Sequence, residues 1–191
     1  MLQFLPRAIG RSLRPLRAGL GRTALSELDA DPRNGSIDLF SAAFSDGERI
    51  PRRYTADGAG VSPSIQWRGV PRGAASLVLI VEDMDSPTAH PFVHAIVWGL
   101  PAGDGGLPEG ALSNARARLR GPPMGRNSDH QARYRPPKPP RGHEPHRYAF
   151  EAIALDVAPS FAAPPVRAEI VEVARGHVVG AGCLIGTYAR G

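Results

Sequence analysis

The chain has 191 residues, of which 42% are hydrophobic and 21% charged, so one domain with a sizeable core is expected and global disorder is not. A single cysteine excludes an internal disulfide framework and a cysteine-based zinc site, and the apolar runs fall far short of the roughly 18 residues of a membrane span. The 23 Lys and Arg residues against 18 Asp and Glu give a net charge of +5, which is compatible with anionic partners but names none.

Residues 1–33 are predicted to form a basic amphipathic segment ahead of the main domain. Leucine and isoleucine fall on one helical stripe, arginines fall opposite, and no acidic residue occurs before Glu27. Three interpretations stay open: a helix packed on the domain or on the twin subunit of a homodimer, weak contact of residues 1–30 with a membrane surface, and disorder. Because the segment lacks the features of a secretory signal, we expect a cytoplasmic protein.

The domain from residue 34 to residue 191 is predicted to consist mainly of strands. One helix is expected over residues 165–175, ended by Gly176. Residues 101–145 are rich in glycine and proline and show little periodicity, which is typical of a functional or disordered loop region. The pattern predicts a β-rich sandwich with peripheral helices, whose expected strands are 64–67, 77–81 (apolar throughout and so buried on both faces), 93–98, 147–155 and 177–188.

Two aspartates follow the predicted strand 77–81. Residues i and i+2 of an extended chain share a face, so Asp83 and Asp85 would point the same way where the chain turns through Pro87. Such carboxylates accept hydrogen bonds, hold a histidine or bind a cation, and turn capping is the structural alternative. His94 lies inside an apolar strand, either as a core histidine bonded to a backbone carbonyl or facing a polar pocket with its charge set by an aspartate.

A third cluster follows a proline-rich stretch. His146 and Tyr148 are i and i+2 at the start of a strand, so they share a face, and Arg147 points to the other face, where an ion pair is expected. An imidazole beside a phenol offers two hydrogen-bond donors to one anion. Pro139 and Pro140 fix the loop and expose neighbouring backbone N–H groups, and concave clusters of such groups bind phosphate or carboxylate.

Other chemistries find little support in the sequence. His90 and His94 are four residues apart, which in a strand is about 13 Å, so neither a metal nor a cofactor is predicted. There is no GxSxG, P-loop, GxGxxG or helical HExxH motif. Cys183 is expected to be a buried small residue beside Gly182 rather than a nucleophile. Aromatic residues make up only 6%, so the arginines do not predict nucleic-acid binding.

From about residue 37 to residue 190 the sequence resembles the phosphatidylethanolamine-binding protein family, and within it the bacterial branch called Raf-kinase-inhibitor-like proteins. Each matching motif is modest, but their order and spacing together are highly specific. The motifs are Phe44-Ser45-Asp46-Gly47, Ser62-Pro63-Ser64-Ile65-Gln66-Trp67, Asp83-Met84-Asp85-Ser86-Pro87 with His94, Pro139-Pro140-Arg141-Gly142 with His146-Arg147-Tyr148, and Gly186-Thr187-Tyr188. Three positions depart from the family pattern: Met84 replaces a proline, Ala95 replaces a tryptophan common in bacterial members, and Lys138 lies where many members carry small residues.

The resemblance implies a mainly β fold, with a large antiparallel sheet packed on a smaller one and peripheral helices. It also implies a pocket at one end of the fold that accepts phosphate, acetate or a phosphoethanolamine head group. The implied ligand-binding residues are Asp83, which would orient His94, then His94 itself, His146, Tyr148 and the backbone N–H of Lys138. The implied pocket-shaping residues are Asp85, Pro87, Pro139 and Pro140, with cis peptide bonds at Pro87 and Pro139.

We therefore expect non-enzymatic binding of a small anionic or phosphorylated ligand, with regulation of a kinase or protease as the role that relatives suggest. Two alternatives remain. One is an ester or phosphoester hydrolase that uses the same histidines and aspartate as acid and base. The other is an inhibitor that acts through its surface, with the pocket as a switch.

Overall fold

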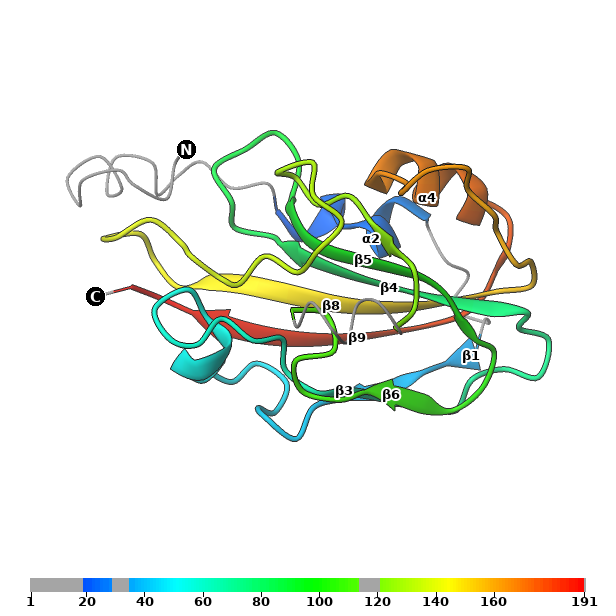
Figure 1. Ribbon diagram of the computed structural model, residues 1–191, viewed down its shortest axis with the longest axis horizontal. Coiled ribbons are helices and arrows are strands. Elements are labelled where there is room, and N and C mark those ends of the chain that lie inside the picture. The colour runs from blue at the N-terminus through cyan, green and yellow to red at the C-terminus, as the bar shows by residue number, and fades with distance from the viewer. Residues whose placement is uncertain (1–18, 29–34, 114–120, 191) are drawn as a thin grey trace.

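The computed structural model describes residues 19–28, 35–113 and 121–190 (Figure 1). A six-stranded sheet has the order β1-β9-β8-β4-β5-β7, and a three-stranded sheet has the order β2-β3-β6. The large sheet contains β1 (Gly35–Ser36), β4 (Ser76–Asp83), β5 (Phe92–Pro101), β7 (Met124–Gly125), β8 (His146–Leu155) and β9 (Val178–Tyr188). The small sheet contains β2 (Asp38–Phe40), β3 (Ile65–Arg68) and β6 (Gly105–Leu107). The helices are η2 (Leu20–Arg22), α2 (Ala24–Leu28), η3 (Arg52–Tyr54) and α4 (Arg167–Ala174).

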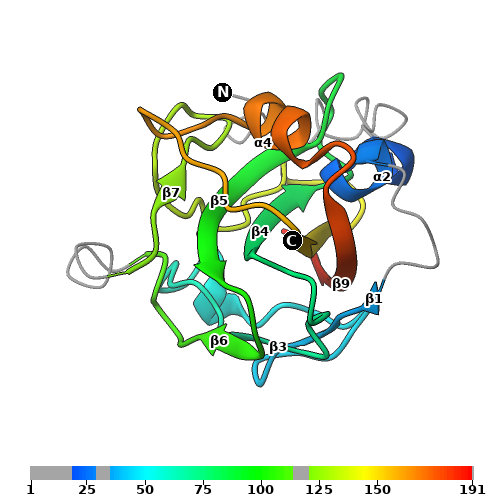
Figure 2. The same ribbon diagram turned by 90° about the vertical axis from the view of Figure 1, so that its right-hand side faces the viewer.

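The molecule has three layers. The small sheet lies against one face of the large sheet, and α2 and α4 cover the other face (Figures 1 and 2). All pairs within the large sheet are antiparallel except β1 with β9, which run parallel. The predicted mainly β fold with two packed sheets is therefore confirmed, with one parallel pair at its edge.

The central position of β4 in the large sheet explains why its residues 77–81 are apolar throughout. Leu77, Leu79 and Val81 pack between the two sheets, whereas Val78 and Ile80 pack under the helices. Successive side chains of a strand point to opposite faces, so a strand with a core on each side needs apolar residues at nearly every position. The prediction of a strand buried on both faces is confirmed, because every residue of β4 is buried.

The antiparallel register brings the two diagnostic motifs to one end of the sheet. Asp83, the last residue of β4, lies opposite Tyr148 near the start of β8 and opposite Phe92 at the start of β5. The first motif therefore meets the second although about 60 residues of chain separate them. This end of the large sheet is where the site described below lies.

The expected long strands and the helix are present, with ends shifted by a few residues. Sequence analysis missed β1, β2, β6 and β7, because strands of two or three residues are too short for an alternation pattern. Cys183 was expected to be buried, and this is wrong: it is exposed on β9. The predicted cis bonds at Pro87 and Pro139 are also wrong, since no peptide bond in the described ranges is cis.

Part of the predicted amphipathic segment, residues 1–18 and 29–33, lies outside the described residues. The remaining part packs on the domain through α2, where Ala24 is completely buried and belongs to the core under the helices. Among the residues that the structure describes, no helix combines the length and the apolar character that crossing a bilayer requires.

Candidate ligand-binding site

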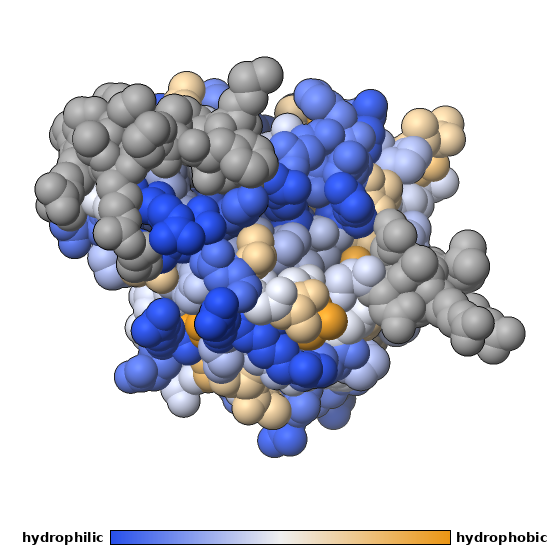
Figure 3. Space-filling view, turned by 60° about the vertical axis from the view of Figure 1, so that its left-hand side comes forward, coloured by the Kyte–Doolittle hydropathy of each residue, from blue (hydrophilic) through white to orange (hydrophobic). Residues whose placement is uncertain are grey.

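A cavity of about 360 Å³ lies where β4 ends and β5 and β8 begin. Its walls come from three stretches of chain, 83–94, 128–129 and 135–140. The lining residues are Asp83, Ser86, Pro87, Thr88, Phe92, His94, Ser128, Asp129, Arg135, Pro136, Lys138, Pro139 and Pro140. The surface on this side of the molecule is mostly hydrophilic, with small separate hydrophobic patches (Figure 3).

Most of the predicted site residues meet at this cavity. Of those expected to bind ligand, Asp83, His94 and Lys138 line the wall. His146 and Tyr148 do not line it. They are completely or almost completely buried directly behind it, in ring contact with each other, and Tyr148 also contacts His94. The expected wall residues Pro87, Pro139 and Pro140 line the cavity, whereas Asp85 does not.

The tautomer of His94 follows from its hydrogen bond. Its Nδ1 lies 2.5 Å from the backbone carbonyl oxygen of Arg135, and a carbonyl can only accept, so Nδ1 carries a proton. Burial lowers the pKa of His94 below its usual 6.5, and the Asp83 charge opposes this only in part. His94 is therefore neutral at pH 7, and its Nε2 is a hydrogen-bond acceptor. The expected orientation of His94 by Asp83 is wrong, because the loop carbonyl orients it instead.

Asp83 pairs with His146. The Nδ1 atom of His146 lies 2.9 Å and 2.7 Å from the two carboxylate oxygens of Asp83, and both side chains are buried. On the other side of the same imidazole, Nε2 of His146 lies 2.6 Å from Nδ1 of His143. Sequence analysis missed the contact of His143 with His146. The signal that could have found it is the short spacing, since the two histidines are only three residues apart.

Tyr148 is completely buried, and its hydroxyl has no hydrogen-bond partner among the described residues. Its ring lies edge-on to His94 with centroids 5.2 Å apart and 6.4 Å from the ring of His146. Burial, and secondarily the Asp83 charge, raises the pKa of Tyr148 well above 10, so the phenol keeps its proton. A buried donor without an acceptor costs roughly 1–3 kcal/mol, which a bound acceptor would recover.

Asp85 supports the site from outside. Its carboxylate accepts two hydrogen bonds from the Arg147 guanidinium, at 2.8 Å and 2.7 Å, and a third from the Arg147 backbone N–H at 2.9 Å. The expected ion pair of Arg147 is thus present. The prediction that Asp83 and Asp85 point the same way is wrong, because β4 ends at Asp83 and their partners, His146 and Arg147, lie on opposite faces of β8.

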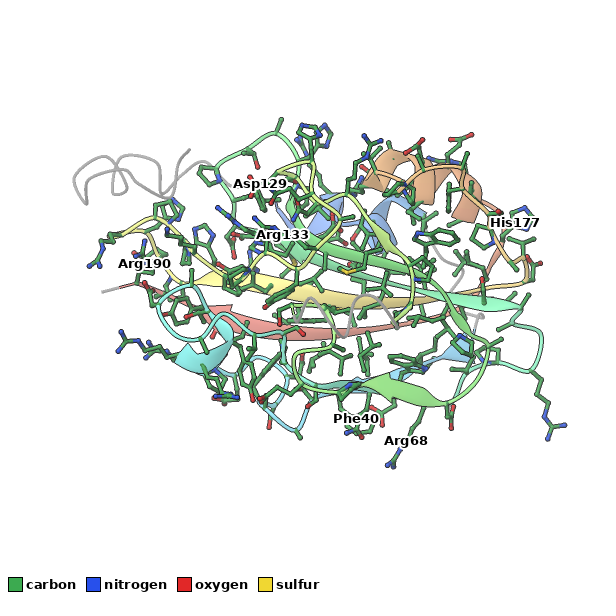
Figure 4. The ribbon with its side chains drawn as sticks, viewed as in Figure 1. Phe40, Arg68, Asp129, Arg133, His177 and Arg190 are labelled. Atoms are coloured by element: carbon green, nitrogen blue, oxygen red, sulfur yellow. The ribbon has the colours of Figure 1, made fainter. Side chains whose placement is uncertain are left out.

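The charges on the wall are mixed. Arg135 and Lys138 bring positive charge, whereas Asp83 and Asp129 bring negative charge. Asp129 is paired with Arg135, whose Nε lies 3.1 Å from its carboxylate, and it projects from the loop that precedes the proline-rich wall (Figure 4). The site can therefore donate hydrogen bonds to an anion through Arg135 and Lys138. It also presents one hydrogen-bond acceptor, Nε2 of the neutral His94.

Two packed β-sheets with a small cavity at the ends of the central strands of the large sheet are the features of a ligand-binding class of protein. The sequence model described as phosphatidylethanolamine-binding protein matches residues 40–189, and the chain therefore belongs to this family. The resemblance noted from the motifs is confirmed, including its bacterial type.

Relatives match along most of their length. A UPF0098 protein of Methanothermobacter thermautotrophicus is 38% identical over 155 residues, which cover 81% of this chain and 100% of the relative. A putative phosphatidylethanolamine-binding protein homolog from Chlamydia trachomatis has a similar crystal structure, with a TM-score of 0.73 and 37% identity over 82% of this chain and 99% of that one. YbcL of E. coli, described as a member of the mammalian family, has a TM-score of 0.74 and 26% identity over 81% and 99%.

Proposed function

We propose that the protein binds a small anionic ligand, phosphate or a phosphoryl head group such as phosphoethanolamine, in the cavity bounded by Asp83, His94 and Lys138, without transforming it. The observation that carries this proposal is the Tyr148 hydroxyl, a buried donor beside the cavity with no acceptor in the described chain. Natural proteins rarely leave such a donor unsatisfied, so an acceptor bound there would complete the site.

The roles follow from the hydrogen-bonding capacity of each group. Arg135 and Lys138 provide positive charge on the wall of the cavity. Tyr148 lies buried behind this wall, against the ring of His94, and donates to a ligand oxygen that enters beneath the wall. The neutral His94 accepts, through Nε2, a hydrogen bond from a P–OH group or from the ammonium of a head group. A volume of about 360 Å³ lies at the low end of the roughly 300–1,000 Å³ typical of ligand pockets, which suits a head group rather than a large molecule.

Phosphate is expected to protect the protein against heat, because a ligand that binds only the folded state stabilises it. At 100 times the dissociation constant the gain is about 2.7 kcal/mol, which for a chain of this size raises the melting midpoint by about 5–10 °C. Calorimetry with phosphate, phosphoethanolamine and chloride at matched ionic strength measures the effect. Identical midpoints in all three solutions would contradict the proposal.

Tyr148→Phe is expected to separate ligand binding from stability. The variant removes an unsatisfied buried hydroxyl, so the free energy of unfolding of the unliganded protein rises by about 1 kcal/mol while the protection by phosphate falls. Tyr134→Phe is the matched control, since Tyr134 is also buried but its hydroxyl donates to the Tyr54 carbonyl at 3.3 Å. Tyr134→Phe is expected to lower the free energy of unfolding by about 1 kcal/mol and to leave the protection by phosphate unchanged. Full protection of Tyr148→Phe by phosphate would count against the assigned role.

A further inference from the structure

The proposed anion site has a carboxylate in its wall. Asp83 lines the cavity, and an approaching anion would meet its negative charge at close range. The second acid of the wall, Asp129, is already paired with Arg135. Within the described ranges, the hydrogen-bonded partner of Asp83 is the imidazole of His146, which is charged only when it is doubly protonated, whereas the Arg147 guanidinium is bonded to Asp85 and acts on Asp83 through its charge alone. Anion binding at this site therefore depends on where the protons of this group lie.

The protons can be assigned from the geometry. The Asp83 carboxylate can only accept, so Nδ1 of His146 carries a proton and donates it. One further proton lies between Nε2 of His146 and Nδ1 of His143, which are 2.6 Å apart. With that proton alone the three groups carry a net charge of −1. With one more proton, His146 becomes an imidazolium that donates to Asp83 and to His143, and the net charge is zero.

We propose that Asp83, His146 and His143 form a proton-sharing relay that takes up one proton when an anion binds. His143 is the positioning residue, because it accepts the hydrogen bond from the second N–H group of the His146 imidazolium. This inference rests on the proposed function and adds its regulation: the affinity for the anion falls as the pH rises. The three groups are hydrogen-bonded in series and buried, so a proton gained by one of them is shared along the series.

The other groups around His146 do not supply the missing charge. From β5, the neutral His94 lies on the cavity side. On β8 itself, Tyr148 keeps its proton, and Arg147 points to the opposite face, where it is paired with Asp85. From β9, Tyr188 lies opposite His146 in the register and donates its hydroxyl to Asp57. Asp83 and His143 are the two groups that are hydrogen-bonded to the ring nitrogens of His146.

The sign of the pH effect follows from this arrangement. A negative ligand beside the relay raises its affinity for the extra proton, so binding takes up protons wherever the unliganded relay lacks one. By linkage, the affinity then falls by up to tenfold for each pH unit across that range. At low pH, where the unliganded relay already holds the proton, uptake and pH dependence disappear.

The test is isothermal titration of phosphate into the full chain, in buffers of different ionisation enthalpy, at pH 6 to 9. Phosphate also titrates in this range, but its own contribution is common to all variants and cancels in the difference between them. His143→Leu removes the acceptor for the imidazolium and is expected to lower proton uptake towards the contribution of phosphate alone, with about tenfold weaker binding at pH 7. His143→Asn keeps an acceptor oxygen, so its proton uptake and its affinity for phosphate are expected to be close to those of the wild type.

The control is His177→Leu. His177 also contacts a carboxylate, that of Asp156 at 2.8 Å, but it is exposed and lies at the opposite end of the molecule from Arg190 (Figure 4). This variant should leave affinity and proton uptake unchanged. Nitrogen-15 NMR of the imidazoles in the wild-type chain adds a readout that needs no variant, and one ring of the relay should become an imidazolium when phosphate is added.

The outcomes separate this inference from the function on which it rests. No binding heat with the wild-type chain in any buffer overturns the proposed function itself. Binding with the same proton uptake in the wild type and in His143→Leu overturns the relay and leaves the binding function intact. Binding without a new imidazolium in the wild-type spectrum has the same consequence, whether or not the His143 variants fold.

Discussion

Replacing Arg167 by methionine is expected to lower the free energy of unfolding by about 3–5 kcal/mol, because it leaves a buried carboxylate without its cation. The Nε atom of Arg167 lies 2.7 Å from the carboxylate of Glu82, which is completely buried. The same guanidinium binds Glu27 of α2 at 2.8 Å and the Arg22 carbonyl at 2.8 Å. The substitution therefore also weakens the attachment of the segment 19–28 to the domain.

Arg53→Met provides the matched control, since it removes one arginine–carboxylate pair from the surface. The guanidinium of Arg53 lies 2.6 Å from Glu109, but both side chains are exposed, and solvent screening leaves such surface pairs with little effect on stability. Urea denaturation followed by circular dichroism gives the free energy of unfolding of the two variants. They are compared with the same dependence of that free energy on urea concentration. Equal losses in both would show that Arg167 does not neutralise Glu82 in the way described.

Replacing Glu151 by glutamine is expected to stabilise the protein by about 3 kcal/mol above pH 7 and to have no effect near pH 4. Burial raises the pKa of Glu151 from its usual 4.5 to about 7, and the charge of Glu82 adds to the shift. An acid with a raised pKa binds its proton more tightly in the folded state. Its ionisation therefore removes stability as the pH rises from about 4.5 through 7, and glutamine, which cannot ionise, avoids this loss.

The measurement is the free energy of unfolding of both proteins between pH 4 and pH 9. Glu109→Gln should behave in the opposite sense, because the hydrogen bond from Arg53 lowers the pKa of Glu109 and its charge is favourable on the surface. Parallel curves for wild type and Glu151→Gln across the whole range would contradict the assignment. A larger gain at acid pH than at alkaline pH would contradict its sign.

Periodicity predicted the long strands because burial on one or both faces leaves a regular pattern, as in β4. It also placed the two motifs on strand ends, and the resemblance then implied that these ends meet. The partner of Asp83 could not be predicted in this way, since the choice between His94 and His146 depends on the path of the loop whose Arg135 carbonyl captures His94.

The buried carboxylates were missed for a different reason. Glu82 and Glu151 interrupt apolar strands, which is a visible signal, but their partners lie far away in sequence. The backbone N–H of Ala24 donates to Glu82 at 2.6 Å and that of Leu25 to Glu151 at 3.1 Å. Contacts between a sheet and a short preceding helix depend on tertiary packing, which single-sequence periodicity does not contain.

The order of strands in the large sheet has a consequence for synthesis on the ribosome. β8 and β9 are made last, yet they lie between β1 and β4. Until both have emerged, the growing polypeptide displays the apolar β4 with one bare edge, and β1 has nothing to pair with. Bare strand edges recruit other chains, so the nascent protein is most prone to aggregation after β4 has emerged and before β8 and β9 follow, and chaperone cover at that stage should increase its yield.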